Sequence, residues 1–141
     1  MQRAFFACGN LEINASDTPD LNDVTDMSGM FTGIKAINQD VTGWDVSRVT
    51  NMSKLFSGVT TFNQNISGWQ IGNVTDMSGM FAGTPFNQNI SGWNVSKVTN
   101  MARMFFEATA FNQNISGWNV SKVTNMAGMF LGAAFNQSLA V

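Results

Sequence analysis

The chain is poor in the residues from which catalytic and metal sites are most often built. Its 141 residues include no histidine and one cysteine, Cys8. A single cysteine excludes an internal disulfide framework, and without histidine the usual zinc-binding spacings are absent as well. We therefore expect a protein without a cofactor, without a metal centre of the common kinds, and without enzymatic activity.

Long apolar runs and dense basic patches are also missing. No hydrophobic run approaches the roughly 18 residues that a transmembrane helix needs, so we expect no membrane insertion. The formal net charge is −2, and it is unevenly placed. Residues 1–45 hold seven acidic and two basic side chains, whereas residues 46–141 hold two acidic and five basic ones. Neither part has the clustered positive charge of a nucleic-acid binder, so we expect no nucleic-acid partner.

The chain is instead rich in repetition. The stretch FNQNISGWNVSKVTNM occurs at 86–101 and again at 111–126, and looser copies lie at 37–52 and 62–77. A period of this length indicates stacked units that share one core. We expect a single repeat domain over 1–141 that begins and ends within a repeat, and therefore a fragment of a longer array. The period of 24 or 25 residues is marked by Trp44, Trp69, Trp93 and Trp118.

Each unit contains two hydrophobic periods. Trp93 and Val95 alternate around Asn94, which is typical of a strand with one buried face. Val98, Met101 and Phe105 then follow at the spacing of a helix face. Stacked strands lie ~4.8 Å apart and packed helices ~8–10 Å apart, so such a stack should curve with its helices outside. The sequence thus predicts an α/β repeat solenoid, a leucine-rich-repeat-like curved stack of about five units, each a very short strand plus a short helix.

A glycine follows the hydrophobic end of most units and suits a left-handed cap at the end of the predicted helix. In one unit Glu107 takes this place. If the position needs positive φ, the glutamate costs on the order of 1 kcal/mol there. The glycines are Gly33, Gly58, Gly83 and Gly132.

Three further rows of residues have a structural interpretation. Methionines at helical spacing predict core filling by the flexible thioether. The tryptophans favour a buried ladder over a stacking platform for sugars or bases, because they alternate with an apolar partner. The asparagines are expected to bond the backbone of the loop that enters each strand. The asparagine row is Asn38, Asn63, Asn87, Asn112 and Asn136.

The repeat resembles a known family. The run VTNMARMFFEATAF at 98–111 fits V-T-x-hydrophobic-x-x-x-F-x-x-A-x-x-aromatic, and AFFACGNLEI at 4–13 is similar to A-F-x-x-C-x-x-L. These residues resemble the BspA-like class of leucine-rich repeats, in the W-x-V-S-x-V-T-x-M-x-x-M-F form found in bacterial surface proteins. The chain departs from the pattern at Glu107, Ile37 and Gly72.

This resemblance implies a protein displayed outside the cell or on its surface, acting in adhesion. The expected function is a non-enzymatic module that binds an extracellular protein or glycan through the solvent side of the strand ladder. A passive spacer or stalk is the alternative, because both need a stiff repeat array. The expected binding residues are Asp45, Gln70, Asn94 and Asn119, flanked by Arg48, Asn73, Lys97 and Lys122.

Two other hypotheses start from rows of oxygen atoms. An unbroken threonine row could order water and bind ice, although helix capping and curvature would oppose this; it consists of Thr25, Thr50, Thr75, Thr99 and Thr124. Four aspartates at three-residue spacing could hold calcium through their oxygens, but they lack the glycine and distal glutamate of a calcium loop. They are Asp17, Asp20, Asp23 and Asp26.

Overall fold

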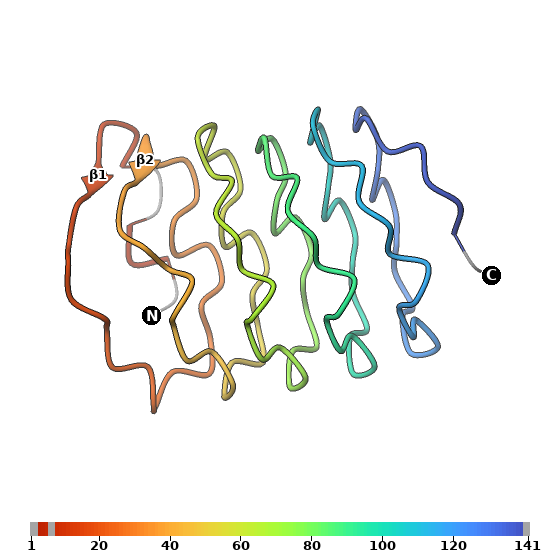
Figure 1. Cartoon of the computed structure of the whole chain (residues 1–141), viewed down its shortest axis with the longest axis horizontal. Helices are drawn as coiled ribbons and strands as arrows, with labels where there is room; N and C mark the ends of the chain where they lie inside the picture. The colour runs from red at the N-terminus through yellow and green to blue at the C-terminus, as the bar shows by residue number, and fades with distance from the viewer. Residues whose placement is uncertain (1–2, 6–7, 140–141) are drawn as a thin grey trace.

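The computed structural model describes residues 3–5 and 8–139. The chain winds into successive coils, each one circuit of 24 or 25 residues, which lie side by side along the long axis of the molecule (Figure 1). Isolated parallel bridges join neighbouring coils at one equivalent position. They link Asp26 to Asn51, Asn51 to Asp76, Asp76 to Asn100, and Asn100 to Asn125.

Regular secondary structure is scarce. Within the described residues there are two strands, β1 (Glu12–Ile13) and β2 (Ala36–Ile37), which pair in parallel. Glu12 lies opposite Ala36, and Ile13 lies opposite Ile37. The same part of the chain contains no helix.

The expected α/β leucine-rich-repeat solenoid is therefore wrong. The segments predicted as helices are turns, and the two strands are not where Trp93 and Val95 led us to expect them. The predicted curvature rested on helices wider than strands, and no helix of the described residues supplies that difference in width.

The segment 27–33 shows what replaces the helix. Met27, Gly29 and Phe31 donate their N–H groups to the backbone carbonyls of Asn51, Ser53 and Leu55 in the following coil, at 2.9, 2.8 and 3.1 Å. Between them, Met30 donates its N–H to the carbonyl of Met27, three positions back in the same coil, and Ser28 donates its N–H to Asp26 Oδ1. We call this the turn segment; its equivalents are 52–58, 77–83, 101–107 and 126–132.

The turn segment needs positive φ at two places. The first is the last position of the segment, where Gly58 has φ +73° and Glu107 has φ +53°. The sequence prediction that this place needs a left-handed conformation is confirmed, although it closes a turn and not a helix. The second place, three positions into the segment, was not predicted. It holds glycine in some coils and Arg3, Lys54 or Arg103 in others.

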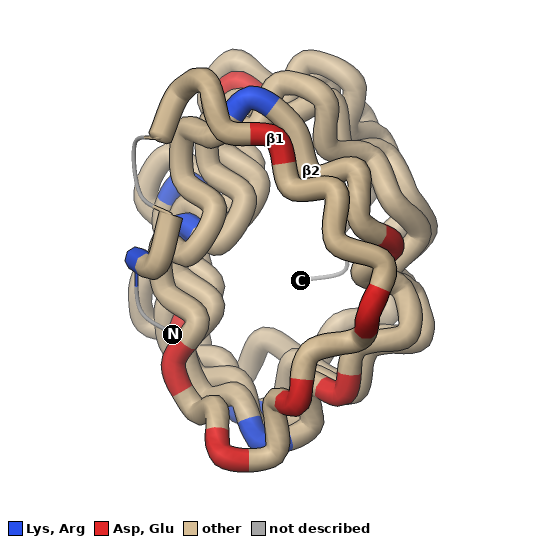
Figure 2. Tube along the Cα trace, turned by 90° about the vertical axis from the view of Figure 1, so that its left-hand side faces the viewer, with Lys and Arg blue, Asp and Glu red and all other residues tan. Residues whose placement is uncertain are grey.

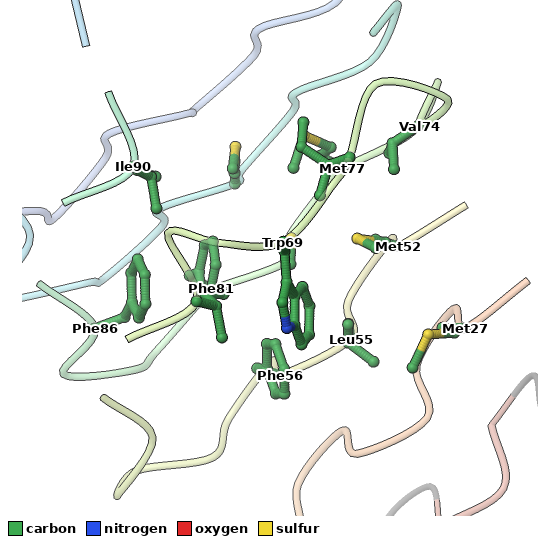
Figure 3. Packing of buried hydrophobic residues seen from close by; sticks show 14 of the residues in the cluster. Met27, Met52, Leu55, Phe56, Trp69, Val74, Met77, Phe81, Phe86 and Ile90 are labelled. Atoms are coloured by element: carbon green, nitrogen blue, oxygen red, sulfur yellow. The ribbon is translucent and has the colours of Figure 1, made fainter. Parts of the chain in front are cut away.

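The core is a set of rows that run through all coils. Met52 and Met77 are fully buried and belong to successive coils, as Figure 3 shows, and Met27 continues their row. At the C-terminal end the row emerges, because the side chain of Met126 is 42 % exposed. The predicted methionine core and buried tryptophan ladder are confirmed; the tryptophans are 2–8 % exposed.

Phenylalanines form the centre of the core. Phe81 stacks on Phe86 with ring centroids 4.0 Å apart, and both rings are visible in Figure 3. Phe81 also stacks on Phe56 and Phe105 of the neighbouring coils, at 6.0 and 5.6 Å. Each coil thus completes the core of its neighbours, as expected for units too small to bury a core alone.

The asparagine row also does what the sequence predicted. The side-chain carbonyl of Asn63 accepts the backbone N–H of Asn87, at 2.9 Å, and that of Asn87 accepts the N–H of Asn112, at 3.0 Å. The following glutamines add bonds of the same kind, as when Gln113 donates to Asn87. Backbone groups in the connecting loops are satisfied in this way.

Replacing Glu107 by glycine should stabilise the protein by about 1 kcal/mol, because glycine adopts φ +53° without the steric cost of a side chain. Chemical denaturation of the two proteins measures this. The matched control is Gly58→Ala, which should destabilise, since an L residue is strained at φ +73° although the added Cβ would find room, 3.6 Å from Gly33 Cα. A Glu107→Gly variant less stable than the parent would contradict the assignment.

Candidate functional site

The predicted binding residues fall into two rows with different roles. The first, which we call the loop row, comprises Asp45, Gln70, Asn94 and Asn119, all exposed. Side-chain oxygens of Asp45, Asn94 and Asn119 accept the backbone N–H two residues on, at 3.0, 3.2 and 3.1 Å. Gln70 donates to the carbonyl of Gly68. Their polar atoms therefore hold local turns.

The second row contains the predicted residues Arg48, Asn73, Lys97 and Lys122. Asp23, which was not predicted to bind a partner, holds the same repeat position one coil earlier, and we call the five residues, all exposed, the polar edge. Three of its members reach back to the preceding coil. Arg48 donates to the carbonyl of Asn22 at 2.9 Å, and Asn73 to that of Ser47 at 2.8 Å. Lys97 Nζ lies 2.7 Å from Asn73 Oδ1. These bonds fix long side chains that would otherwise lose freedom on binding a partner.

The polar edge borders an open groove of about 590 Å³. Arg48, Asn73 and Lys97 line it together with Asn22, Asp23, Thr25 and Thr50. The structure thus brings together three of the predicted flanking residues, and it leaves Lys122 and the loop row outside this groove. Sequence reasoning missed Asn22, Asp23, Thr25 and Thr50 as lining residues; the signal available was that Asp23 shares the repeat position of Arg48.

The threonine row runs beside the polar edge and is exposed. Thr50, Thr75 and Thr99 donate their hydroxyl protons to the carbonyl of the threonine one coil earlier, at 3.1, 3.1 and 3.2 Å. The expected helix-capping role is wrong, because there is no helix among the described residues for these hydroxyls to cap. The hydroxyls hold coils together and leave their oxygens toward solvent.

Most cations are not paired with carboxylates. Among the described residues the structure contains one ion pair, between Lys35 and Glu12. It lowers the pKa of Glu12 and raises that of Lys35, through their hydrogen bond first and their charges second. Viewed along the stack, the basic residues lie at several separate places around the circumference (Figure 2). The five bases after residue 45 form no ion pair with a carboxylate of the described residues.

The aspartates named for calcium are not gathered into a site. Over the described stretches, 3–5 and 8–139, no group of three or more histidine, cysteine, aspartate or glutamate side chains is placed to hold a metal ion. Asp20 and Asp26 instead accept the backbone N–H two residues on, at 3.0 and 2.8 Å. The part of the chain that the structure describes also includes no helix with the length and apolar character needed to span a bilayer.

Asp45 should titrate below an ordinary aspartate. Hydrogen bonds from the Ser47 side chain and backbone lower its pKa, and Arg48 adds a smaller attraction. A lowered folded-state pKa stabilises the fold above the unfolded-state pKa, and this contribution is lost as pH falls through the folded-state value. NMR titration of the carboxyl carbons should show the low midpoint, and Ser47→Ala should raise it.

Asp45→Asn is the matched variant, because Asn94 and Asn119 make the same turn at the same repeat position. We expect it to fold and to lose less stability than the parent as pH falls below the ordinary aspartate pKa. If Asp45 titrates at or above that ordinary value, the carboxylate does not hold the turn.

Comparison with protein families gives one match. The model of the family described as "Mycoplasma protein of unknown function, DUF285" matches residues 1–85 and 73–141. The chain belongs to this family. No curated protein and no solved structure matched the chain.

The expected membership of the BspA-like leucine-rich repeats is therefore wrong. The matched family is a different one, and the described residues lack the helix that the resemblance implied. The residues behind the resemblance, such as Val98, Met101 and Phe105, are buried for another reason, because they point inward from turns.

Proposed function

We propose that this member of the DUF285 family is a non-enzymatic interaction module, which binds an extracellular protein or glycan along its polar edge. The observation that supports this most is the groove of about 590 Å³ at Arg48, Asn73 and Lys97. It is open, and its lining combines cationic, amide and hydroxyl groups with the carboxylate of Asp23. Such groups suit recognition of hydroxyl- or carboxylate-bearing surfaces.

Preorganisation favours the same proposal. The side chains of Arg48, Asn73 and Lys97 are each held by a bond to the preceding coil, so ordering them costs little when a partner binds. The same position recurs at Lys122 in the next coil. A partner with repeated groups can therefore make several weak contacts at once and gain through effective concentration.

The non-enzymatic part of the proposal rests on composition. The sequence has no histidine, which is the commonest general base. Among the residues that line the groove, Asp23 alone has a carboxylate; it is exposed and lies beside Arg48. A lone exposed carboxylate lacks the second, differently tuned group that acid–base catalysis uses.

A passive spacer is the second candidate, and the loop row favours it. Side-chain oxygens of Asp45, Asn94 and Asn119 are hydrogen-bonded within their own turns, so much of the regular polar surface stabilises the fold itself. A spacer requires only that each coil pack stably against the next. Ice binding by the threonine row stays a prediction that a thermal-hysteresis assay tests.

The deciding experiment is a glycan and extracellular-matrix protein array probed with the parent and with Arg48→Ala/Lys97→Ala/Lys122→Ala. These side chains are exposed, so the variant should fold, which circular dichroism checks. Lys35→Ala is the matched control, because it removes a cation beside β2 that already pairs with Glu12. We expect a specific signal that the triple variant loses by tenfold or more and the control keeps.

An array on which the folded parent protein gives no specific signal would favour the spacer. A signal shared equally by all three proteins would place binding elsewhere on the surface.

The proposal includes a location outside the cell or on its surface. Antibody labelling of intact cells should detect the protein without permeabilisation, and cytoplasmic proteins serve as the negative control. Labelling that requires permeabilised cells would contradict an extracellular partner.

A further inference from the structure

The second positive-φ position of the turn segment carries an unexplained pattern. It alternates between basic residues and glycine from one coil to the next, and we call it the alternating row. Lys54 and Arg103 have φ +56° and +55°, whereas Gly79 between them has φ +62°. The full row is Arg3, Gly29, Lys54, Gly79, Arg103 and Gly128.

Glycine would be the relaxed residue at every place in this row, because an L side chain is disfavoured at such φ. The chain uses glycine in every second coil and keeps a cation in the others. Non-glycine residues held in left-handed conformations often mark function, since the strain has to be offset by some gain.

The geometry shows what the alternation achieves. A Cβ on Gly79 would lie 3.2 Å from Lys54 Cγ, and a Cβ on Gly128 would lie 3.5 Å from Arg103 Cγ. Lys54 and Arg103 therefore each lie over the glycine of the following coil. The result is one exposed cation every second coil, or roughly every 10 Å at the ~4.8 Å spacing of parallel backbone.

A groove of about 390 Å³ lies between two of these cations. Gly79, Ala82 and Ala102 are small residues of its lining, and Lys54 and Arg103 both line it. The Arg103 guanidinium lies 5.7 Å from the ring centre of Phe106, another lining residue. The small alanine side chains leave room for a ligand between the two cations, and the Phe106 ring adds an apolar contact beside Arg103.

Two carboxylates lie near this groove without lining it. Asp76 Oδ1 accepts the Ser78 N–H and hydroxyl, at 2.8 and 2.7 Å, so these donors already occupy that oxygen. Glu107 follows Phe106 and is exposed. Neither is in an ion pair with Lys54 or Arg103, because the one ion pair of the described residues joins Lys35 and Glu12.

We propose that the alternating row binds an acidic polysaccharide with one carboxylate or sulfate per disaccharide, laid along the stack across Lys54 and Arg103. Such a polymer carries its charges at about the interval of two coils. A polymer with a charge on every unit, such as polyphosphate, does not match this interval, and two isolated cations are too few for the salt-dependent binding of a nucleic acid. The row is separate from the polar edge and does not depend on it.

The test measures binding of hyaluronan oligosaccharides, which carry one carboxylate per disaccharide, by calorimetry at low ionic strength. Lys54→Gly/Arg103→Gly should lose binding at least tenfold while its melting temperature rises, because strain is relieved. Lys54→Met/Arg103→Met keeps the apolar stems over the glycines and should lose binding equally. Glu107→Gly is the matched control: it also relieves strain but should bind as well as the parent, or more tightly.

Absence of hyaluronan binding by the folded parent would overturn the proposal, and so would retention of binding by both double variants. Tighter binding of polyphosphate than of hyaluronan would contradict the match between the spacing of the cations along the stack and the spacing of the charges along the polymer. Loss of binding in the Arg48/Lys97/Lys122 variant alone would reject the alternating row and support the polar edge, so the two proposals fail separately.

Discussion

The backbone hydrogen bonds from one coil to the next are the interaction on which the rest of this structure depends. In the turn segment, alternate N–H groups point along the stack, as when Lys54, Phe56 and Gly58 donate to the carbonyls of Ser78, Met80 and Ala82. A helix would direct the same groups along its own axis. The positive φ values make the difference, because they turn successive peptides to opposite sides. The coil thereby forms backbone hydrogen bonds to its neighbours in place of the regular internal hydrogen bonds of a helix.

This explains which features the sequence could predict. The period and the buried rows are visible in the sequence, since stacking places the same residue at the same depth in each coil. The bridges from Asp26 to Asn125 follow that period, and Trp69 and Trp93 are buried as their row requires. The left-handed conformation at Glu107 was also predictable, because glycine holds the equivalent place in other units.

The predicted helix was wrong for an identifiable reason. Two consecutive turns with bonds three residues apart bring Met27, Met30 and Phe31 inward, and this imitates the spacing of a helix face. Gly29, in the middle of that pattern, was the available warning, since an interior glycine weakens a helix. The fold class followed from the helix and was wrong with it. The family was inferred from the motifs at 98–111 and 4–13, and the match to a different family overturns it. Part of the candidate site was predictable from the sequence, because Arg48 and Lys97 do line a groove. Only the structure shows that the side-chain oxygens of Asp45 and Asn94 are already hydrogen-bonded within their own turns.

Repetition also determines where information about a partner can reside. Every exposed position becomes a row, and a row that is the same in all coils can be explained by stacking alone, as the threonines are by their bonds to one another. Rows that change along the stack need a further cause. The polar edge changes from Asp23 to Lys122, and the alternating row places a strained cation where glycine would be relaxed. The polar edge has its cations only after residue 45, and the alternating row has Arg3, Lys54 and Arg103 in every second coil. The charge that a partner meets is therefore set by variation that the fold itself does not require.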